Sequence, residues 1–298
     1  MESILKRVKS GEILVSDGAM GTMLQAHGLK PGQCPEEWCV SHPDIVLSIS
    51  KAYVEAGAQI IQTNSFGGTR LKLKGYGFEN RVREFALAAA RIAREAIGDK
   101  GYIAASVGPT GYGHLLEPYG DADPQELKDA FREQITALAE GGVDAICIET
   151  MMSLDEAALA IQAAKEETNL TVIATMTFEK GARGYRTMMG ISPTQAAQQL
   201  PEMGADIIGA NCGNGIAEMV DIVAEMRSVV QDVPILVHAN AGLPTLEGDV
   251  TVFKETPEMM AAKVPDLVKA GANIIGGCCG TTPEHIHAIA QAVRALTA

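Results

Sequence analysis

The sequence predicts an α/β protein of the TIM (β/α)8 barrel class. Three observations lead to this prediction: eight short apolar runs, helical periodicity between them, and a turn-to-strand pattern that recurs four times. Continuous apolar strands that alternate with helices indicate a parallel sheet covered by helices. An open doubly wound sheet is the alternative. The similar size of the eight units, and the lack of a Gly-rich phosphate turn after the first run, favour the barrel.

The elements follow one another in a regular order. The chain begins with "MESILKRVKSGE", which predicts a short amphipathic helix rather than a signal peptide. The strand-like runs span residues 13–18, 60–66, 102–109, 145–150, 172–178, 207–212, 235–241 and 274–279. Between them lie segments with the 3.6-residue period of a helix, such as residues 81–98 and 153–167.

An internal repeat supports the barrel. "EAGAQIIQTNS", "EGGVDAICIET", "EMGADIIGANC" and "KAGANIIGGCC" each contain a helix end on glycine, a small turn and an apolar strand. The residues seven places after the glycine are Asn64, Glu149, Asn211 and Cys278. These equivalent places are the carboxyl ends of strands, where a TIM barrel carries its active site. We therefore expect four separate segments to meet at one mouth.

Composition limits the class of protein. The length of 298 residues suits one barrel, so residues 1–298 are expected to form a single domain. The net charge of −13 argues against nucleic acid and anionic membranes as partners. The sequence contains no run of about 18 apolar residues that could span a membrane. Six cysteines without a signal peptide indicate a reducing, cytoplasmic location.

Three cysteines carry the strongest chemical signal: Cys212, Cys278 and Cys279. Each follows a strand-like run, and neighbouring cysteines such as Cys278 and Cys279 rarely form a disulfide with each other. Three thiolates leave one position of a tetrahedral zinc open, as in catalytic sites. The alternative is three buried free thiols, a common state of cysteine. A zinc bound by three thiolates is a poor source of hydroxide, but it can hold a fourth thiol deprotonated.

The sequence resembles the zinc-dependent homocysteine S-methyltransferases. The matching segments are "DGAMGTMLQ", "QTNSFGGTRLKL", "SVGPTG", "IETMMSLDEAALA", "GANCG", "NAGLP" and "GGCCGTTPEHI". The "NAGLP" segment is more similar to the homocysteine module of cobalamin-dependent methionine synthase than to the betaine or S-methylmethionine branches. The segment "GARGYRTMMGISP" departs from the "GGRTLTGTSP" pattern of that module.

The resemblance implies roles for particular residues. Cys212, Cys278 and Cys279 would hold zinc, and Asp17 and Glu149 would hold the amino-acid end of homocysteine. Two carboxylates at a barrel mouth suit an α-ammonium group. Taken alone, Asp17 would be interpreted as a helix or turn cap, and the other matching residues favour the binding role.

Three asparagines complete the expected site. Asn240 would fill the open zinc position or bond to substrate, or it is simply a turn residue. Asn64 and Asn211 would bind substrate or orient loops.

Other candidates are interpreted as structural. His238, a lone histidine near a strand end, is expected to be structural, and Cys147 is expected in the core. Met188 and Met189 could line the mouth. The remaining candidates are read as incidental thiols or surface and helix-packing residues: Cys34, Cys39, His285 and His287.

The expected function is methyl transfer to the sulfur of homocysteine, giving methionine. Residues 1–298 contain no Asp-x-His-x-x-Gly motif, so methylcobalamin or another methylcorrinoid is expected to arrive on a separate protein. A donor such as S-methylmethionine or betaine is the alternative. A zinc hydrolase is disfavoured because it would use histidine and carboxylate ligands. A non-catalytic zinc-binding partner of a corrinoid protein would not need carboxylates at the mouth.

Overall fold

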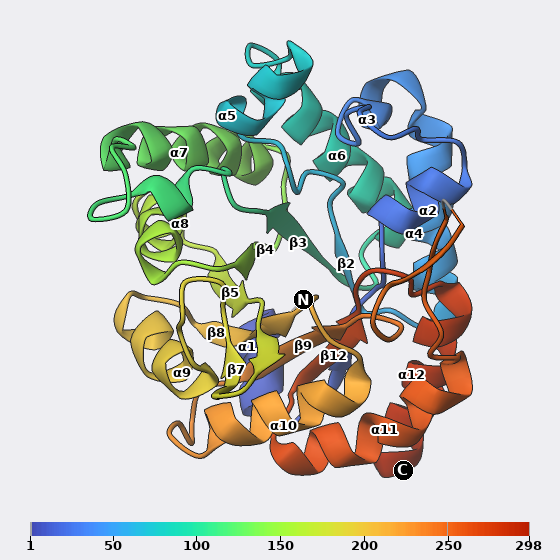
Figure 1. The fold of residues 1–298 in the computed structure, drawn as a ribbon. Helices are drawn as coiled ribbons and strands as arrows, with labels where there is room; N and C mark the ends of the chain where they lie inside the picture. Colours follow the sequence, from blue (N-terminus) through green and yellow to red (C-terminus); the bar gives the residue numbers. More distant parts are fainter. Residues whose placement is uncertain (1, 249, 298) are drawn as a thin grey trace.

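The computed structural model describes residues 2–248 and 250–297, and its centre is a parallel eight-stranded barrel inside a ring of helices (Figure 1). The strand order is β1-β12-β9-β8-β5-β4-β3-β2. The two ends of this order meet through a parallel bridge between Ser16 and Ile60, with the Asp17 N–H donating to the Ile60 carbonyl (3.0 Å). The sheet is therefore closed, and the predicted TIM-barrel class is confirmed.

Each of the eight predicted runs overlaps a barrel strand. Their bounds are β1 (Leu14–Val15), β2 (Ile60–Gln62), β3 (Tyr102–Val107), β4 (Ala145–Met151), β5 (Thr171–Met176), β8 (Ile207–Asn211), β9 (Ile235–Ala239) and β12 (Ile274–Gly277). Nearly every residue in these strands is buried, because helices cover one face and the barrel interior the other.

The helices form the outer layer. Their bounds are α1 (Ile4–Lys9), α2 (Gly21–Ala26), α3 (Trp38–Ser41), α4 (Pro43–Ala56), α5 (Arg70–Leu73), α6 (Val82–Ile97), α7 (Pro124–Glu140), α8 (Leu154–Glu167), α9 (Pro193–Glu202), α10 (Ile216–Arg227), α11 (Pro257–Ala270) and α12 (Pro283–Thr297), with short 3-10 turns at Lys74–Tyr76 and Gly113–Leu115. Side-chain caps begin several of them; Ser192 and Gln195 form a reciprocal capping box on α9. No helix among the described residues is long and apolar enough to cross a membrane.

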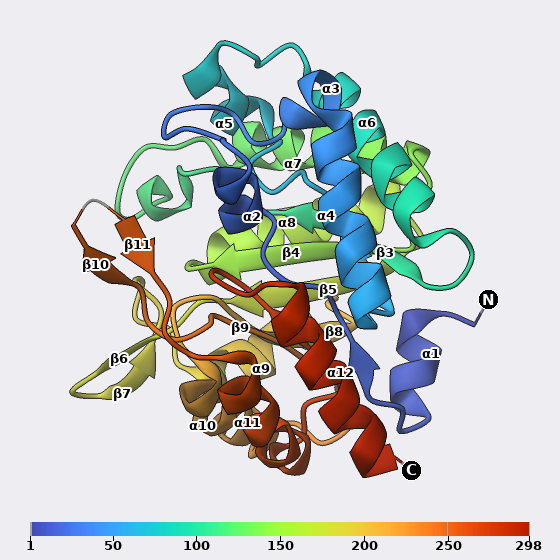
Figure 2. The same cartoon turned by 90° about the vertical axis from the view of Figure 1, so that its right-hand side faces the viewer.

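The predicted N-terminal helix is α1, which closes the bottom of the barrel. Its Ile4 and Val8 are buried in one cluster with Leu14, Ile60 and other inward-facing strand residues. Figure 2 shows α1 at the end of the barrel opposite the strand tips. Because this end is filled by apolar side chains, the opposite end is left for chemistry.

Two antiparallel hairpins were not predicted. One pairs β6 (Glu179–Gly181) with β7 (Gly184–Arg186), and the other pairs β10 (Thr245–Glu247) with β11 (Val250–Val252). Both follow barrel strands and extend from the side of the molecule opposite α1 (Figure 2). They form part of the rim around the mouth.

The bottom of the barrel also explains the sequence repeat. One polar side chain in each repeat accepts a hydrogen bond from a backbone N–H of the neighbouring strand or its start. The pairs are Gln59 with Val15 (3.2 Å), Asp144 with Ile103 (2.8 Å), Asp206 with Val172 (2.8 Å) and Asn273 with Ile235 (2.9 Å). The repeat therefore knits adjacent strands together at the end away from the mouth.

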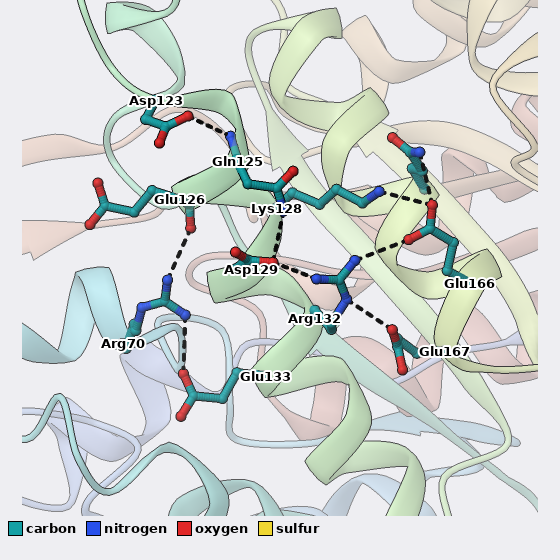
Figure 3. Close-up of polar contacts among 11 residues, drawn as sticks. Arg70, Asp123, Gln125, Glu126, Lys128, Asp129, Arg132, Glu133, Glu166 and Glu167 are labelled. Atoms are coloured by element: carbon teal, nitrogen blue, oxygen red, sulfur yellow. Dashed lines mark hydrogen bonds and ion pairs between the residues drawn. The ribbon is translucent and has the colours of Figure 1, made fainter.

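The outer faces of α7 and α8 are joined by ion pairs (Figure 3). Arg132 pairs with Asp129 on its own helix and with Glu166 (3.1 Å) and Glu167 (2.8 Å) on α8, while Lys128 reaches Glu166 (2.8 Å). These groups are partly exposed, so solvent screens each pair and its contribution to stability is small. We interpret the network as helix-to-helix bracing.

Candidate active site at the barrel mouth

The three predicted cysteines meet at the carboxyl ends of β8 and β12. Their sulfur atoms all lie within 4.8 Å of one another, and Cys212 Sγ is 3.8 Å from Cys279 Sγ. Strand β9, which lies between β8 and β12, fixes both segments. The Cys212 N–H donates to the His238 carbonyl (3.0 Å), and the Cys278 N–H donates to the Ala239 carbonyl (2.7 Å).

The thiols act as one electrostatic group. The Cys278 and Cys279 thiols lie against the Cys212 sulfur and lower the pKa of Cys212, because they stabilise its thiolate. The same contacts raise the pKa of Cys278, together with its burial. A cluster that stabilises negative charge on sulfur is suited to a soft cation.

Asn240 lies beside this group. Its side chain contacts Cys212 and helps to lower that thiol's pKa, yet its buried Oδ1 has no hydrogen-bond partner among the described residues. A buried carbonyl oxygen without a partner is costly, so this atom points to a missing ligand. The three thiols match three positions of a tetrahedral zinc, and Asn240 lies beside them.

Asp17 and Glu149 form the second half of the mouth. Both are buried, and both are bonded to Gln62 on β2. Its backbone N–H donates to Asp17 Oδ2 (2.7 Å), and its Nε2 donates to Glu149 Oε1 (2.9 Å). Ser106 also donates through its hydroxyl to Glu149. No ion pair between described residues includes either carboxylate.

Burial therefore dominates the electrostatics of this pair. It raises the pKa of Asp17 to about 7, assisted by the charge of Glu149, and raises the pKa of Glu149 to about 7. Each carboxyl would ionise fully if a cation were placed between them. An ammonium group is such a cation, and the pair has the burial and charge to bind one.

The sulfurs and the carboxylates open into one cavity of about 340 Å³. This volume is within the range of small-molecule sites. Its polar lining includes Asp17, Glu36, Gln62, Thr63, Asn64, Ser65, Ser106, Glu149, Thr150, Cys212, Cys278 and Cys279. The predicted cysteines and carboxylates, which are far apart in the sequence, thus line the same cavity.

The asparagines divide between lining and support. Asn64 lines the cavity, and its Nδ2 donates to the Pro35 carbonyl (2.8 Å). Asn211 does not line the cavity, because its amide is engaged by Thr150 and Thr175. Of the two roles expected for Asn211, the geometry therefore favours loop orientation over substrate binding.

Glu36 is a cavity-lining carboxylate that the sequence reasoning missed. It is buried, accepts from the Gly67 N–H (2.6 Å) and the Cys34 thiol (3.2 Å), and so ties the segment before α3 to the loop after β2. The signal in the sequence is weak, because "CPEEW" resembles many exposed acidic turns.

The residues interpreted as structural lie outside the sulfur cluster. His238 is buried in β9, where burial lowers its pKa to about 4, and Cys147 is buried in β4. Met188 is exposed and does not line the cavity. Cys34, Cys39 and His285 are buried, and His287 is exposed.

Comparison with known proteins places this chain in a family. Residues 14–293 match the family model described as homocysteine S-methyltransferase. A curated relative, the methionine synthase of Mycobacterium tuberculosis (strain ATCC 25618 / H37Rv), is 31% identical over 304 aligned residues. The match covers 96% of this chain but 25% of the relative, so the chain spans about a quarter of that protein's length.

Solved structures agree on the fold. The homocysteine methyltransferase MmuM from Escherichia coli is 21% identical in its metallated form, with a TM-score of 0.78 over 94% of this chain and 96% of that chain. Its oxidized form is 22% identical, with a TM-score of 0.77 over 96% and 97%. The family match across nearly the whole barrel is decisive: the chain belongs to the homocysteine S-methyltransferase family.

Proposed function

We propose that this chain binds zinc through Cys212, Cys278 and Cys279 and transfers a methyl group to the sulfur of homocysteine, giving methionine. One observation carries the proposal. The three sulfurs share a cavity with two buried carboxylates that have no cationic partner among the described residues. A thiol and an ammonium group on one small molecule would satisfy both halves.

Asp17 and Glu149 would bind the α-ammonium group through charge-assisted hydrogen bonds. Gln62 would keep the two carboxylates in place, since it donates to both. Bound at the cysteines, zinc would hold the substrate thiol deprotonated as a nucleophile. The sulfur then forms a bond to the methyl carbon as the bond between that carbon and the donor breaks, and the electron pair of the broken bond leaves with the donor.

For the donor we propose a methylcorrinoid carried on a separate protein. The similarity to a methionine synthase and the "NAGLP" segment after β9 support this choice. The rim would receive that partner: the strands of both hairpins stand on the mouth side, and Arg183 is exposed at the turn of β6–β7. Tyr185 does not face the partner, since it is buried and its hydroxyl contacts Asp221 on α10 (3.1 Å).

S-methylmethionine or betaine is the second candidate donor. The sulfurs, and the two carboxylates that lack a cationic partner among the described residues, would serve either donor equally, because the acceptor site is the same. We also propose that residues 1–298 work as one homocysteine-binding domain. Since the described cysteines are all free thiols, we propose the reducing cytoplasm as its location.

Metal content and activity of two cysteine variants test the proposal. Native protein is expected to hold about one zinc per chain, as a three-thiolate tetrahedral site requires. Cys212→Ala should lose zinc and homocysteine methylation together while remaining folded. Cys147→Ala is the matched control for metal loss, because it removes a buried thiol outside the cluster and should keep its zinc.

Full zinc occupancy in Cys212→Ala would contradict the ligand assignment. Stoichiometric zinc without methylation by any corrinoid, sulfonium or betaine donor would instead support the non-catalytic partner module. The two outcomes separate the metal site from the reaction.

A further inference from the structure

Two residues at the mouth have an uncommon backbone conformation. Among the described residues other than glycine, only Thr150 (φ 61°) and Cys212 (φ 59°) have a positive φ. For a β-branched residue such as Thr150 this conformation is strained, so the surrounding structure must hold it. Thr150 directly follows Glu149, and Cys212 contributes one of the three sulfurs of the cluster.

Thr150 lies in an irregularity of β4. The pairing of β4 with β5 runs from Ile148 opposite Ala174 to Met151 opposite Met176, so β4 contains one extra residue between these pairs. Such a bulge re-aims a side chain next to a site. Here the bulge contains Glu149 and Thr150, and Glu149 lines the cavity.

A single amide holds this bulge. Asn211 Oδ1 accepts from the Thr150 N–H (2.8 Å) and from the Thr175 hydroxyl (2.6 Å), and Asn211 Nδ2 donates to Thr150 Oγ1 (2.7 Å). Asn211 is fully buried and immediately precedes Cys212. Asn211, the residue before Cys212, therefore holds Thr150, the residue after Glu149, in place.

We propose that Asn211 is a positioning residue that sets the spacing between the Glu149 carboxylate and the Cys212 sulfur. The inference rests on the proposed function, since this spacing must match the distance between the ammonium and thiol groups of homocysteine. Without the clamp, Thr150 relaxes toward negative φ and turns Glu149 away from the cavity. Asn211 never touches the substrate.

The test measures homocysteine binding, kinetics and zinc content in four proteins. Asn211→Ala should keep about one zinc per chain. Its kcat/KM for homocysteine should fall about 10- to 100-fold through a raised KM, with the calorimetric Kd raised in parallel, because displaced binding groups cost that much. Glycine adopts a positive φ without strain, so Thr150→Gly in the Asn211→Ala background should recover most of the loss.

Asn273→Ala is the matched control. Asn273 also bonds through its side-chain oxygen, to the Ile235 N–H (2.9 Å) and to Arg227 (3.2 Å), but at the opposite end of the barrel. It should lower the unfolding midpoint and leave KM unchanged. If Asn211→Ala binds homocysteine like the native protein, or if Thr150→Gly recovers nothing, the clamp is refuted while the proposed function stands. If native protein neither binds nor methylates homocysteine, both fall.

Discussion

At the residue scale, the mouth is defined by two buried carboxyl groups, Asp17 and Glu149, which have no cationic partner among the described residues. Burial raises the pKa of Asp17 and of Glu149 to about 7, well above the ordinary range of carboxyls. Between about pH 4 and about pH 7 the folded chain therefore binds more protons than the unfolded chain, so these groups reduce stability as the pH rises through this window. An ammonium group removes that penalty, because it favours the ionised form of both carboxyls.

This balance predicts the pH dependence of substrate binding. The KM for homocysteine should fall as the pH rises from about 6 to about 8, since the carboxyls must ionise to pair with the ammonium group. Asp17→Asn should raise KM about tenfold or more at the upper end, the size of a lost charge-assisted bond, and flatten the profile. Steady-state kinetics with zinc-loaded protein measure both. A native KM that does not change with pH would argue against the carboxyls as the ammonium site.

Some site residues could be predicted from the sequence and others could not. Glu149 and Cys278 lie seven places after the glycine of their repeats and Cys212 lies one place further along its own, and parallel strands bring such places together. Asn211 shares that spacing, but its role depends on Thr150 and Thr175, which reach it from other strands. Glu36 belongs to no repeat, so only tertiary structure shows that it faces the cavity.

At the element scale, the repeat stabilises the barrel away from the chemistry. Asp144 Oδ2 accepts from the buried Ile103 N–H (2.8 Å) and from Arg94 (2.9 Å), and three other repeats contain an equivalent bond. Removal of such an acceptor leaves a strand N–H unsatisfied, which is costly in a closed sheet. Each repeat thus contributes at both ends of its strand. At the amino end a polar side chain bonds to the neighbouring strand, and at the carboxyl end a polar or sulfur-containing residue is placed toward the mouth.

Asp144→Ala should therefore lower the free energy of unfolding by about 1–3 kcal/mol, the cost of a buried unsatisfied donor. Its kcat/KM and zinc content should match those of the native protein, because the change lies at the bottom of the barrel. Urea unfolding measures the loss. Asp266→Ala is the control, since Asp266 forms only an exposed pair with Lys263 and should cost about 0.5 kcal/mol or less. Equal losses in the two variants would refute the strand-knitting role.

The barrel elements and the hairpins differed in how far sequence could reveal them. The eight barrel strands are buried apolar runs, so composition alone exposes them. The hairpin strands are three residues long, and β6 is fully exposed. Short exposed strands lack the alternation that marks a half-buried sheet. Their positions depend on the barrel from which they extend.

At the scale of the whole molecule, the two ends of the barrel are unlike. One end is sealed by α1, and the other is surrounded by exposed apolar side chains on loops that follow the strands, such as Tyr119, Met188, Leu243 and Leu246. Exposed apolar side chains of this kind can be covered when a partner binds. This end fits the approach of a partner that carries the methyl group to the sulfur.

The donor can be tested through this rim. With homocysteine and a methylcorrinoid protein, the native chain should form methionine and the reduced corrinoid spectrum, and free methylcobalamin should be a poorer donor because it lacks docked orientation. Leu246, which is 77% exposed on β10, should contribute to docking. Leu246→Ser should raise the KM for the corrinoid protein several-fold, as expected for one interface side chain, without changing transfer from free methylcobalamin.

Val229→Ser provides the control, because Val229 is an exposed apolar residue just after α10, outside the loops that form the rim. It should leave both donors unaffected. If no corrinoid is demethylated while S-methylmethionine or betaine reacts readily, the corrinoid donor is wrong. The sulfur and ammonium sites would still hold homocysteine in that case, because they lie inside the barrel and do not depend on which molecule reaches the mouth. The apolar rim would then have to be explained by a different partner.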